Sequence, residues 1–219
     1  MRISIVIPAY NEEKTIFQVL NSVERVFKDI EHETIVVDDG SSDTTSLICE
    51  SYAGIKCIRL NQNRGKGYAI REGIKYATGK YIAIQDADLE YNPKTLYDLF
   101  QRIKEGLVIY GRRDRKEGYV LYKLGNVFIS SICNLIYRSK LYDIYTCYKI
   151  IPLEIIRSLN LESNGFEIEA EITAKLLRKK TPIIEIPITY HARSFEEGKK
   201  IRGKDALIGA WTLLKNRFV

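Results

Sequence analysis

Short apolar runs alternate with longer segments of helical spacing through the first half of the chain. The runs are rich in β-branched residues, which predicts strands at 3–7, 34–37, 55–60, 81–85 and 107–110. Between them, the apolar spacing predicts helices at 12–27, 44–52, 67–76 and 93–105. Buried strands separated by helices indicate a parallel sheet with right-handed crossovers. Ligands of such sheets bind beyond the carboxyl ends of the strands, so we expect the chemistry there.

The second half of the chain has a weaker pattern. A basic loop at 112–118 precedes an apolar-faced segment at 119–137, which suits either a core helix or contact with lipid. Beyond it we expect a Glu-rich helix at 166–179, a pair of strands within 183–190 and a last helix at 205–217. No internal repeat, low-complexity tract or linker interrupts the sequence, which predicts a single domain over 1–219.

Composition and charge narrow the class of protein. Of 219 residues, 45% are hydrophobic and 28% charged, with 14 Gly and 5 Pro, which excludes collagen-like and disordered chains. The four cysteines lack the paired spacing of a zinc site, and we expect buried free thiols in a reducing compartment. The net charge of +6 could serve nucleic acid, an anionic membrane or phosphorylated ligands, and does not choose among them. We expect no nucleic-acid partner, because Lys and Arg are spread along the chain without a nucleic-acid-reading motif.

Membrane signals are weak in the sequence. The apolar start ends at Pro8 and is too short for the core of a signal peptide. No uninterrupted apolar run approaches the roughly 18 residues of a spanning helix. We therefore expect a cytoplasmic protein that is soluble or, at most, peripheral on the cytoplasmic face of a membrane.

The strongest candidate for chemistry is the sequence Asp86-Ala87-Asp88-Leu89-Glu90, which directly follows the predicted strand at 81–85. Two carboxylates one residue apart at the end of a strand can point into one crevice. Such oxygen donors suit Mg²⁺ or Mn²⁺ together with the phosphates of a substrate. The alternative is an N-cap for the helix that begins at Pro93, but Asn92 stands immediately before that proline and fits the cap better.

Polar residues also follow the first two predicted strands, at 8–13 and 38–41. An aromatic ring there could flank a nucleotide base, and carboxylates could accept hydrogen bonds from a ribose. Helix capping by Asn11 and turn formation at 38–41 are the alternatives. The basic, Gly-containing turn at 63–67 could approach a pyrophosphate through Lys66 and its backbone N–H groups. It lacks the spacing of a P-loop or a dinucleotide fingerprint, which disfavours an ATPase or an NAD enzyme.

Taken in order, the strings I-V-I-P-A-Y-N-E, V-V-D-D-G-S, N-R-G-K-G and Q-D-A-D-L resemble family 2 glycosyltransferases of the GT-A fold. Three later strings, Y-D-I-Y-T-C-Y-K, G-F-E-I-E-A-E-I and A-R-S-F-E-E-G-K-K-I, resemble the branch that contains dolichyl-phosphate mannose and glucose synthases. The resemblance implies an α/β GT-A fold, a single domain with a mostly parallel central sheet flanked by helices. It further implies a nucleotide-sugar-binding half at 1–110 and an acceptor-binding half at 111–219.

The resemblance also implies roles for single residues. Those expected to bind the nucleotide sugar, with the basic turn included, are Pro8, Tyr10, Glu12, Val37, Asp39, Lys66, Asp86 and Ala87. The metal ligands are expected to be Asp86, Asp88 and Glu90, and the acceptor phosphate is expected to meet Arg112, Arg113, Arg193 and Lys199. Asp88, Arg112 and Glu167 are the expected catalytic residues.

Two departures from the family pattern leave choices open. Gly-Arg-Arg stands where the family commonly has Gly-Ser-Arg, so either Arg112 or Arg113 could occupy the basic position. Glu167 stands where some mannose synthases have Lys, which leaves the sugar open.

The implied reaction is the inverting transfer of a hexose from GDP-mannose or UDP-glucose to a polyprenyl (dolichyl) phosphate. A lipid monophosphate, whose second pKa is about 6, is already nucleophilic at neutral pH, so positive groups matter more than a base. The first alternative is a hydroxyl acceptor activated by Glu167, Glu169 or Glu171, although Glu167 and Glu171 could instead pair with Lys175 on one helical face. The second is a non-catalytic nucleotide-sugar-binding subunit. The expected partners are the donor, the lipid acceptor, and a membrane surface or membrane-anchored subunit.

Overall fold

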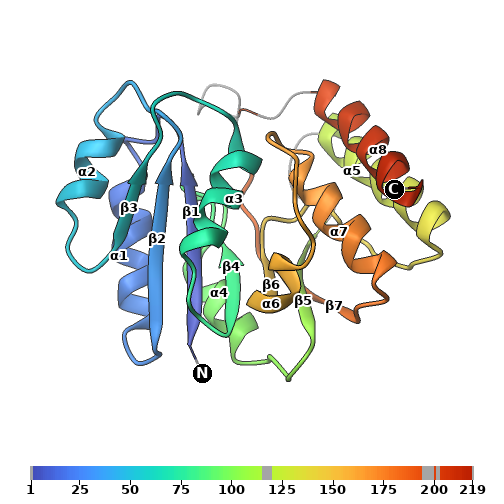
Figure 1. Ribbon diagram of the computed structural model, residues 1–219, viewed down its shortest axis with the longest axis horizontal. Helices are drawn as coiled ribbons and strands as arrows, with labels where there is room; N and C mark the ends of the chain where they lie inside the picture. Colours follow the sequence, from blue (N-terminus) through green and yellow to red (C-terminus); the bar gives the residue numbers. More distant parts are fainter. Residues whose placement is uncertain (1, 115–119, 194–199, 201–202, 219) are drawn as a thin grey trace.

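A seven-stranded sheet forms the centre of the molecule in the computed structural model, which describes residues 2–114, 120–193, 200 and 203–218 (Figure 1). The strand order is β3-β2-β1-β4-β6-β5-β7. The strands are β1 (Ile3–Ala9), β2 (His32–Asp38), β3 (Lys56–Arg59), β4 (Tyr81–Ile84), β5 (Val108–Arg113), β6 (Lys149–Pro152) and β7 (Ile183–Ile188). The helices are α1 (Ile16–Phe27), α2 (Thr45–Ser51), α3 (Lys66–Tyr76), α4 (Pro93–Phe100), α5 (Val120–Tyr137), α6 (Leu153–Arg157), α7 (Ile168–Arg178) and α8 (Gly203–Phe218).

The sheet is mostly parallel, which confirms the α/β architecture expected from the sequence. Strands β1, β2, β3 and β4 pair in parallel, and β5 pairs in parallel with β7. Strand β6 lies between the two groups and runs antiparallel to both β4 and β5. Because β6 reverses the direction twice, all the other strands point the same way, and their carboxyl ends share one edge of the sheet.

Apolar packing holds the helices on both sides of this sheet. The large core includes the buried β-branched residues of β1 and β2 and the inner faces of α1, α3 and α4. A second, smaller cluster joins α5, α7 and α8 beside it through Ile129, Cys133, Ala170, Ala174 and Leu213, among others. Figure 1 shows these three helices together at one end of the molecule, beyond β5 and β7. All four cysteines are free thiols, three of them buried, as expected.

Several elements differ from the sequence-based expectation. Strand β6 and the short helix α6 were not predicted, because β6 has four residues and includes Lys149, a charged residue in a buried position. The expected strand pair within 183–190 was wrong, since β7 is a single strand. Helix α4 ends at Phe100 and not near 105, and the chain turns through Gly106 with a φ of +77°. Asn92 caps α4 as expected, accepting a hydrogen bond from the Lys94 N–H.

Within the described residues, no helix combines the length and the apolar character that crossing a bilayer requires.

Candidate active site

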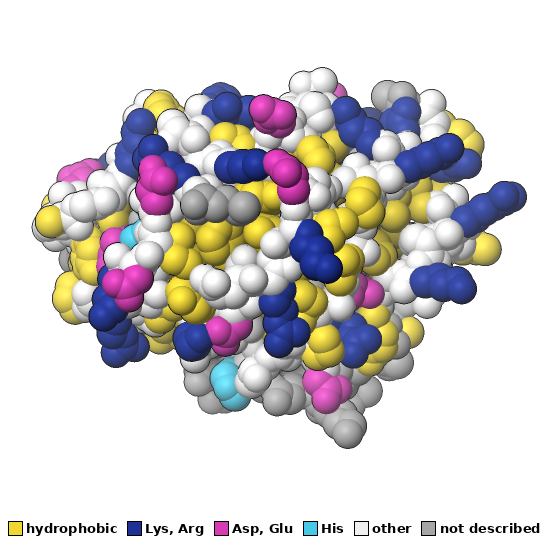
Figure 2. All heavy atoms as spheres, turned by 90° about the horizontal axis from the view of Figure 1, so that it is seen from below, with side chains coloured by type: hydrophobic (Ala, Val, Ile, Leu, Met, Phe, Trp, Pro, Cys, Tyr) yellow, Lys and Arg dark blue, Asp and Glu magenta, His cyan; other side chains and the backbone are white. Residues whose placement is uncertain are grey.

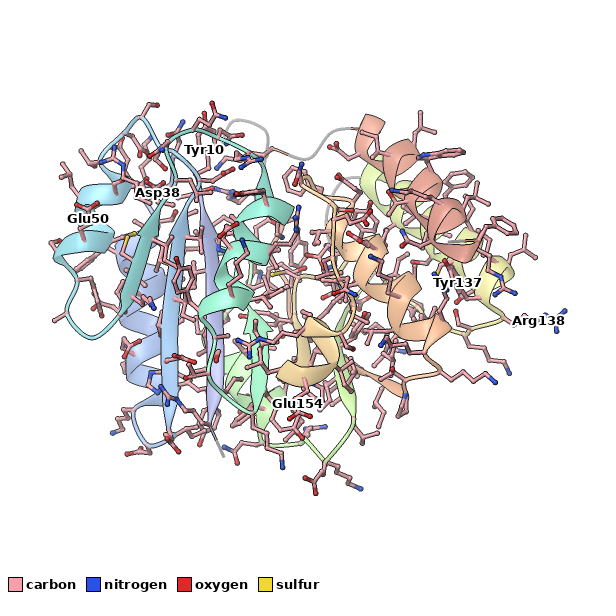
Figure 3. All side chains as sticks on the ribbon, viewed as in Figure 1. Tyr10, Asp38, Glu50, Tyr137, Arg138 and Glu154 are labelled. Carbon is pink, nitrogen blue, oxygen red and sulfur yellow. The ribbon has the colours of Figure 1, made fainter. Side chains whose placement is uncertain are left out.

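The loops after β1 and β2 are joined at the carboxyl edge of the sheet. The Asn11 N–H donates to Ser41 Oγ at 2.9 Å, and the Ser42 N–H donates to Asn11 Oδ1 at 2.9 Å. Asn11 adopts a φ of +50°, a conformation that asparagine tolerates better than most residues. Figure 3 shows Tyr10 and Asp38 at this edge, away from Glu154 at the opposite end of the sheet. The polar residues that follow two separate strands therefore form one connected surface.

The two aspartates after β2 have different partners. Asp38 is fully buried and accepts hydrogen bonds from the Ser41 N–H and from the hydroxyls of Ser41 and Ser46, which is the turn chemistry considered as an alternative above. Asp39 accepts the backbone N–H groups of Arg64 and Gly65 at 2.8 and 2.7 Å. Burial raises the pKa of Asp39 in spite of these two bonds. Asp39 thus fixes the basic turn to β2.

Gly65 at the centre of that turn has no tolerance for a side chain. Its φ is +100°, and a Cβ would collide with the carbonyl oxygen of Asn164. Asn164 O also accepts the Tyr68 N–H at 3.1 Å, so the loop before α7 packs on the first turn of α3. This contact joins the two halves of the chain beside the next charged residue, Lys66.

A buried row of alternating charges runs from Lys66 into the second half of the chain. Lys66 Nζ lies 2.7 Å from Asp86 Oδ1 and 3.4 Å from Glu169 Oε1. The other oxygen of Glu169 accepts a hydrogen bond from Lys149 Nζ, and both of these residues are buried. Although burial lowers it, the neighbouring Asp86 and Glu169 carboxylates raise the pKa of Lys66 well above its ordinary value. Lys66 is therefore charged beside Asp86, where a diphosphate is expected.

Asp88 and Glu90 lie close together after β4 but are held differently. Asp88 Oδ2 lies 3.0 Å from an Arg193 guanidinium nitrogen, and Asp88 Oδ1 accepts the Glu90 N–H at 3.1 Å. Burial, Asp86 and Glu90 raise the pKa of Asp88 to about 7. The Glu90 carboxylate accepts the Tyr190 hydroxyl at 2.6 Å and the Arg193 N–H at 2.7 Å. Glu90 therefore anchors the segment that carries Arg193.

A divalent cation fits the chemistry of this donor set. Burial and the neighbouring Asp86 and Glu90 carboxylates raise the pKa of Asp88, although Arg193 opposes the rise. A divalent cation would offset the repulsion between these carboxylates more than a single arginine does. Within the described ranges, no group of three or more His, Cys, Asp or Glu side chains could hold a metal ion. Two carboxylates suffice for Mg²⁺ or Mn²⁺ when the phosphates of a substrate supply further ligands. Asp86 and Asp88, whose charged partners are Lys66 and Arg193, could hold such a cation, whereas Glu90 accepts the Tyr190 hydroxyl and the Arg193 N–H.

Arg193 also connects the carboxylates after β4 with the loop after β1. Its guanidinium nitrogens lie 3.2 and 3.3 Å from the two carboxylate oxygens of Glu12. Lys200 Nζ lies 2.6 Å from Glu12 Oε1 and donates to the carbonyl oxygen of Tyr10. Arg193, expected at the acceptor phosphate, thus stands between the expected nucleotide and metal residues. Lys199 lies outside the described residues.

The remaining expected nucleotide residues lie at the same edge. Pro8 and Val37 are register partners across β1 and β2, and Ala87 is buried between the two aspartates in sequence. At the ends of β2 and β3, a hollow of about 460 Å³ is lined by Gly40, Ser41, Arg59, Leu60 and Asn61. Gly40 and Ser41 belong to the polar segment that the sequence singled out after the second strand, whereas Arg59, Leu60 and Asn61 were not predicted, because the two strand ends are adjacent only in the folded sheet.

The two arginines at the end of β5 face different surroundings. Arg113 Nε and a terminal guanidinium nitrogen lie 2.7 and 2.8 Å from the two oxygens of Asp143, which is fully buried. Asp143 also accepts the side-chain amide of Asn126 at 2.9 Å. Although burial opposes it, Arg113 lowers the pKa of Asp143 below its ordinary value. The half-buried Arg112 stacks over the Tyr142 ring, 5.0 Å from its centroid.

Each of the three glutamates considered as a general base already has partners within the protein. Glu167 accepts the Gly165 N–H at 2.9 Å, and Glu169 binds Lys149. Glu171 accepts the Glu162 and Ser163 N–H groups and lies 2.6 Å from Lys175 Nζ, as the expected ion pair. The hydrogen bonds from Lys175 and from the loop lower the pKa of Glu171, although burial opposes them. These carboxylates therefore hold the loop and helix together.

Residues missed by the sequence-based reasoning are those that act through long-range contacts. No role was assigned to Tyr190, or to Lys149 at the end of the string Y-D-I-Y-T-C-Y-K, because their partners Glu90 and Glu169 belong to other parts of the chain. Lys200 belongs to a basic cluster that is visible in the sequence, but its contact with Glu12 spans 188 residues. Only the folded chain brings these groups to the edge of the sheet.

Comparison with known proteins shows the family to which this chain belongs. The model for the family described as glycosyl transferase family 2 matches residues 4–159. An uncharacterized protein of Methanocaldococcus jannaschii is 32% identical over 90% of this chain and 93% of its own length. The dolichol-phosphate mannosyltransferase of Pyrococcus furiosus is 28% identical over 93% of this chain, and the dodecaprenyl-phosphate galacturonate synthase of Rhizobium johnstonii is 28% identical over 88%. The aligned region covers about 60% of each of these two longer relatives.

Solved structures show the same fold. Glucosyl-3-phosphoglycerate synthase from Mycobacterium tuberculosis, crystallised with Mn²⁺, uridine diphosphate and phosphoglyceric acid, superposes with a TM-score of 0.77 at 19% identity. The match covers 99% of this chain and 78% of that one. With this GT-A fold and a family match over more than half of its residues, the chain belongs to glycosyl transferase family 2, in the branch that resembles dolichyl-phosphate sugar synthases.

Proposed function

We propose that this protein transfers a hexose from a nucleotide diphosphate sugar to a polyprenyl phosphate, with inversion at the anomeric carbon. The choice of a phosphate acceptor over a hydroxyl acceptor rests on one observation. All three glutamates considered as a base accept hydrogen bonds from the protein itself, whereas Arg112 and Arg193 supply positive charge at the same edge of the sheet. A phosphate acceptor needs such charge and no base, because it is ionised at neutral pH.

The relatives support the same class of acceptor. The names of those from Pyrococcus furiosus and Rhizobium johnstonii state transfer to dolichol phosphate and dodecaprenyl phosphate. Because these proteins are longer than this chain and share less than a third of its residues, the acceptor and the sugar are our proposal. GDP-mannose and UDP-glucose are the two donors that we propose to test first.

The donor is proposed to bind along the edges of β1, β2 and β4. The nucleoside would occupy the hollow near Gly40 and Asn61, next to Asp39. The diphosphate would then reach Lys66, which is charged and lies 2.7 Å from Asp86. Mn²⁺ and uridine diphosphate in the similarly folded synthase support a metal-assisted donor site of this kind.

In the proposed reaction, an oxygen of the acceptor phosphate forms a bond to the anomeric carbon, and the bond from that carbon to the nucleoside diphosphate breaks. Negative charge accumulates on the leaving diphosphate. A bound Mg²⁺ or Mn²⁺, held by Asp86 and Asp88, would stabilise that charge. Lys66 supplies a second, fixed positive group, and Arg193 exchanges its partners Glu12 and Asp88 for phosphate oxygens.

The role of Asp88 tests whether the protein is an enzyme or a non-catalytic binding subunit. Release of nucleoside diphosphate would be measured with Mg²⁺ or Mn²⁺, each donor in turn, and a polyprenyl phosphate. We expect Asp88→Asn to lower turnover at least 100-fold, because it removes a metal-binding charge at the leaving group. Lys94→Gln, which removes an exposed helical ion pair with Asp98, is the matched control and should keep full turnover. Equal turnover of wild type and Asp88→Asn would refute the catalytic role.

A further inference from the structure

Helix α8 is apolar on the side that faces away from the protein. Its inward side packs through Gly209, Leu213 and Asn216, which are all buried. The outward side carries Leu207, Trp211, Leu214 and Phe218, which are 69%, 66%, 42% and 85% exposed. We call these four residues the α8 stripe.

The spacing of the α8 stripe shows that it is a continuous surface. Its members follow one another at intervals of four, three and four residues, so they line up along one face of the helix. A helix on the surface of a soluble protein normally has polar residues on that face. Large exposed apolar patches mark surfaces that bind another molecule.

Positive charges flank the α8 stripe. At about 100° per residue, Lys215 lies to one side of the stripe, where it pairs with the exposed Glu162 at 3.3 Å, and Arg217 lies to the other side. Arg138 and Lys140 are exposed at the end of α5, and Arg178 is exposed at the end of α7. Figure 2 shows Lys and Arg side chains projecting, with hydrophobic side chains between them, at the end of the molecule that carries α5, α7 and α8.

Contacts around Tyr137 place these basic groups next to α8. The Tyr137 hydroxyl donates to the carbonyl oxygen of Leu213 at 2.7 Å, which joins the end of α5 to the middle of α8. Burial and Cys133 raise the pKa of Tyr137 to about 12, and the nearby Arg178 and Arg217 partly oppose that rise. Helix α7, which ends at Arg178, packs together with α5 and α8 in the smaller apolar cluster, and Arg217 belongs to α8 itself, so these arginines lie at the same end of the molecule as Tyr137 and Arg138 (Figure 3).

We propose that the α8 stripe and its basic flanks bind the surface of an anionic phospholipid bilayer. A tryptophan with leucines and a phenylalanine suits the boundary between head groups and acyl chains. Lysine and arginine beside them attract anionic lipid head groups. A second copy of the chain fits less well, because a twofold contact through the stripe would bring the basic flanks of one copy next to the basic flanks of the other.

This surface adjoins the acceptor side of the proposed active site. Asn126 of α5 donates to Asp143, the partner of Arg113. The Tyr145 hydroxyl, two residues beyond Asp143, donates to the carbonyl oxygen of Asp205 at the start of α8 at 3.4 Å. A bilayer on the α8 stripe would thus lie on the side of the molecule where Asp143 holds Arg113, the neighbour of Arg112, although membrane binding does not require the proposed chemistry.

Trp211 provides a direct measurement, because it is the single tryptophan of the chain. The protein would be mixed, without any nucleotide sugar, with vesicles of phosphatidylcholine that contain 30% phosphatidylglycerol, or with vesicles of phosphatidylcholine alone. We expect the anionic vesicles to shift Trp211 emission to the blue, to protect it from acrylamide and to carry the protein down on centrifugation. High salt should weaken this binding at least tenfold, because the head-group attraction is screened.

Matched variants distinguish vesicle binding through the α8 stripe from nonspecific binding through any exposed apolar side chain. Leu207→Gln with Leu214→Gln should weaken vesicle binding at least tenfold while keeping the wild-type melting temperature, because both side chains are exposed. Leu47→Gln, on α2 at the other end of the molecule and 64% exposed, should bind like wild type. Asp88→Asn should also bind like wild type, which separates this result from that of the transfer assay.

Three results would overturn the proposal. The first is the absence of both the emission shift and co-sedimentation with anionic vesicles. The second is equal binding to the two kinds of vesicle, which would remove the role of the basic flanks. The third is a lipid-free dimer that buries Trp211 and is broken by Leu207→Gln with Leu214→Gln, which would assign the stripe to a second copy of the chain.

Discussion

At the scale of single residues, Arg112 and Arg113 are neighbours in one sequence motif but have different partners. Both end β5, yet Arg113 is held by both oxygens of the buried Asp143, while Arg112 stacks on Tyr142. An arginine that neutralises a buried carboxylate cannot leave it at low cost. We therefore propose that Arg112, and not Arg113, meets the acceptor phosphate, a choice that the sequence left open.

Replacing each arginine separately tests this distinction. We expect Arg113→Ala to lower the free energy of unfolding by roughly 3 kcal/mol, because Asp143 would remain buried without its cation. Arg112→Ala should change stability by less than about 0.5 kcal/mol but raise the KM for a polyprenyl phosphate about tenfold, leaving the KM for the donor unchanged. Urea unfolding and steady-state kinetics measure the two effects. Equal stability of the two variants would contradict these assignments.

The pKa of His32 tests the local electrostatics in a region away from the candidate site. The hydrogen bond from its ring to Glu24 raises its pKa above 6.5, with help from the carbonyl of Ile30, although burial opposes the rise. A pKa raised in the folded state contributes stability that is full below pH 6.5 and is lost as the pH rises through the folded value.

We therefore expect the stability difference between wild type and His32→Gln to shrink as the pH rises from 5.5 to 8. NMR titration of the two histidines measures the pKa directly, and Glu24→Gln should return that of His32 toward its ordinary value. A His32 that titrates below pH 6.5 in the wild type would contradict the interpretation.

At the scale of elements, β6 depends on a buried ion pair. Strand β6 is inserted antiparallel between β4 and β5, and its first residue, Lys149, is buried against Glu169 of α7. Glu169 also lies 3.4 Å from Lys66 at the start of α3. The pair thus connects the strand that joins the two parallel groups with both helices that flank the candidate site.

Breaking this pair on one side should be costly. We expect Lys149→Met to lower the free energy of unfolding by roughly 3–5 kcal/mol, because Glu169 would lose its closest cation in a buried position. The double variant Lys149→Met with Glu169→Leu should regain most of that loss, since neither member of the pair is then left as an unpaired charge and Lys66 keeps Asp86 as its partner. Thermal unfolding of the two single variants and the double variant gives the coupling. A Lys149→Met protein as stable as wild type would show that the pair does not hold β6.

Sequence patterns predicted the helices and strands that depend on residues close together in the sequence. The parallel strands β1 to β5 and the helices between them follow from apolar spacing, and the cap at Asn92 follows from its place before Pro93. Strand β6 was not predicted, because it has only four residues and begins with a lysine, so it shows no regular alternation of apolar and polar positions. At the site, the strand ends indicated Asp86 and Asp88, but no local rule predicts that Arg193 pairs with Glu12 across 181 residues.

At the scale of the whole molecule, one edge of the sheet carries both halves of the proposed reaction. Carboxylates follow β1, β2 and β4, and Lys66 follows β3 at the start of α3. Arg112 and Arg113 end β5, and Arg193 follows β7. The antiparallel β6 makes this possible, because it leaves β5 and β7 pointing the same way as β1 and β4. A donor and an anionic acceptor could therefore approach the same edge from neighbouring strands.

The identity of the lipid-linked product tests the central claim most directly. The protein would be incubated with Mg²⁺, GDP-mannose or UDP-glucose, and either a polyprenyl phosphate or the matching polyprenol, and the lipid fraction would be analysed by mass spectrometry. We predict a hexosyl-phosphate lipid from one of the two donors, formed only with the phosphorylated acceptor and with release of the nucleoside diphosphate. A hexose attached to the polyprenol hydroxyl, or no glycosylated lipid with either donor while a hydroxyl acceptor is used, would contradict the account.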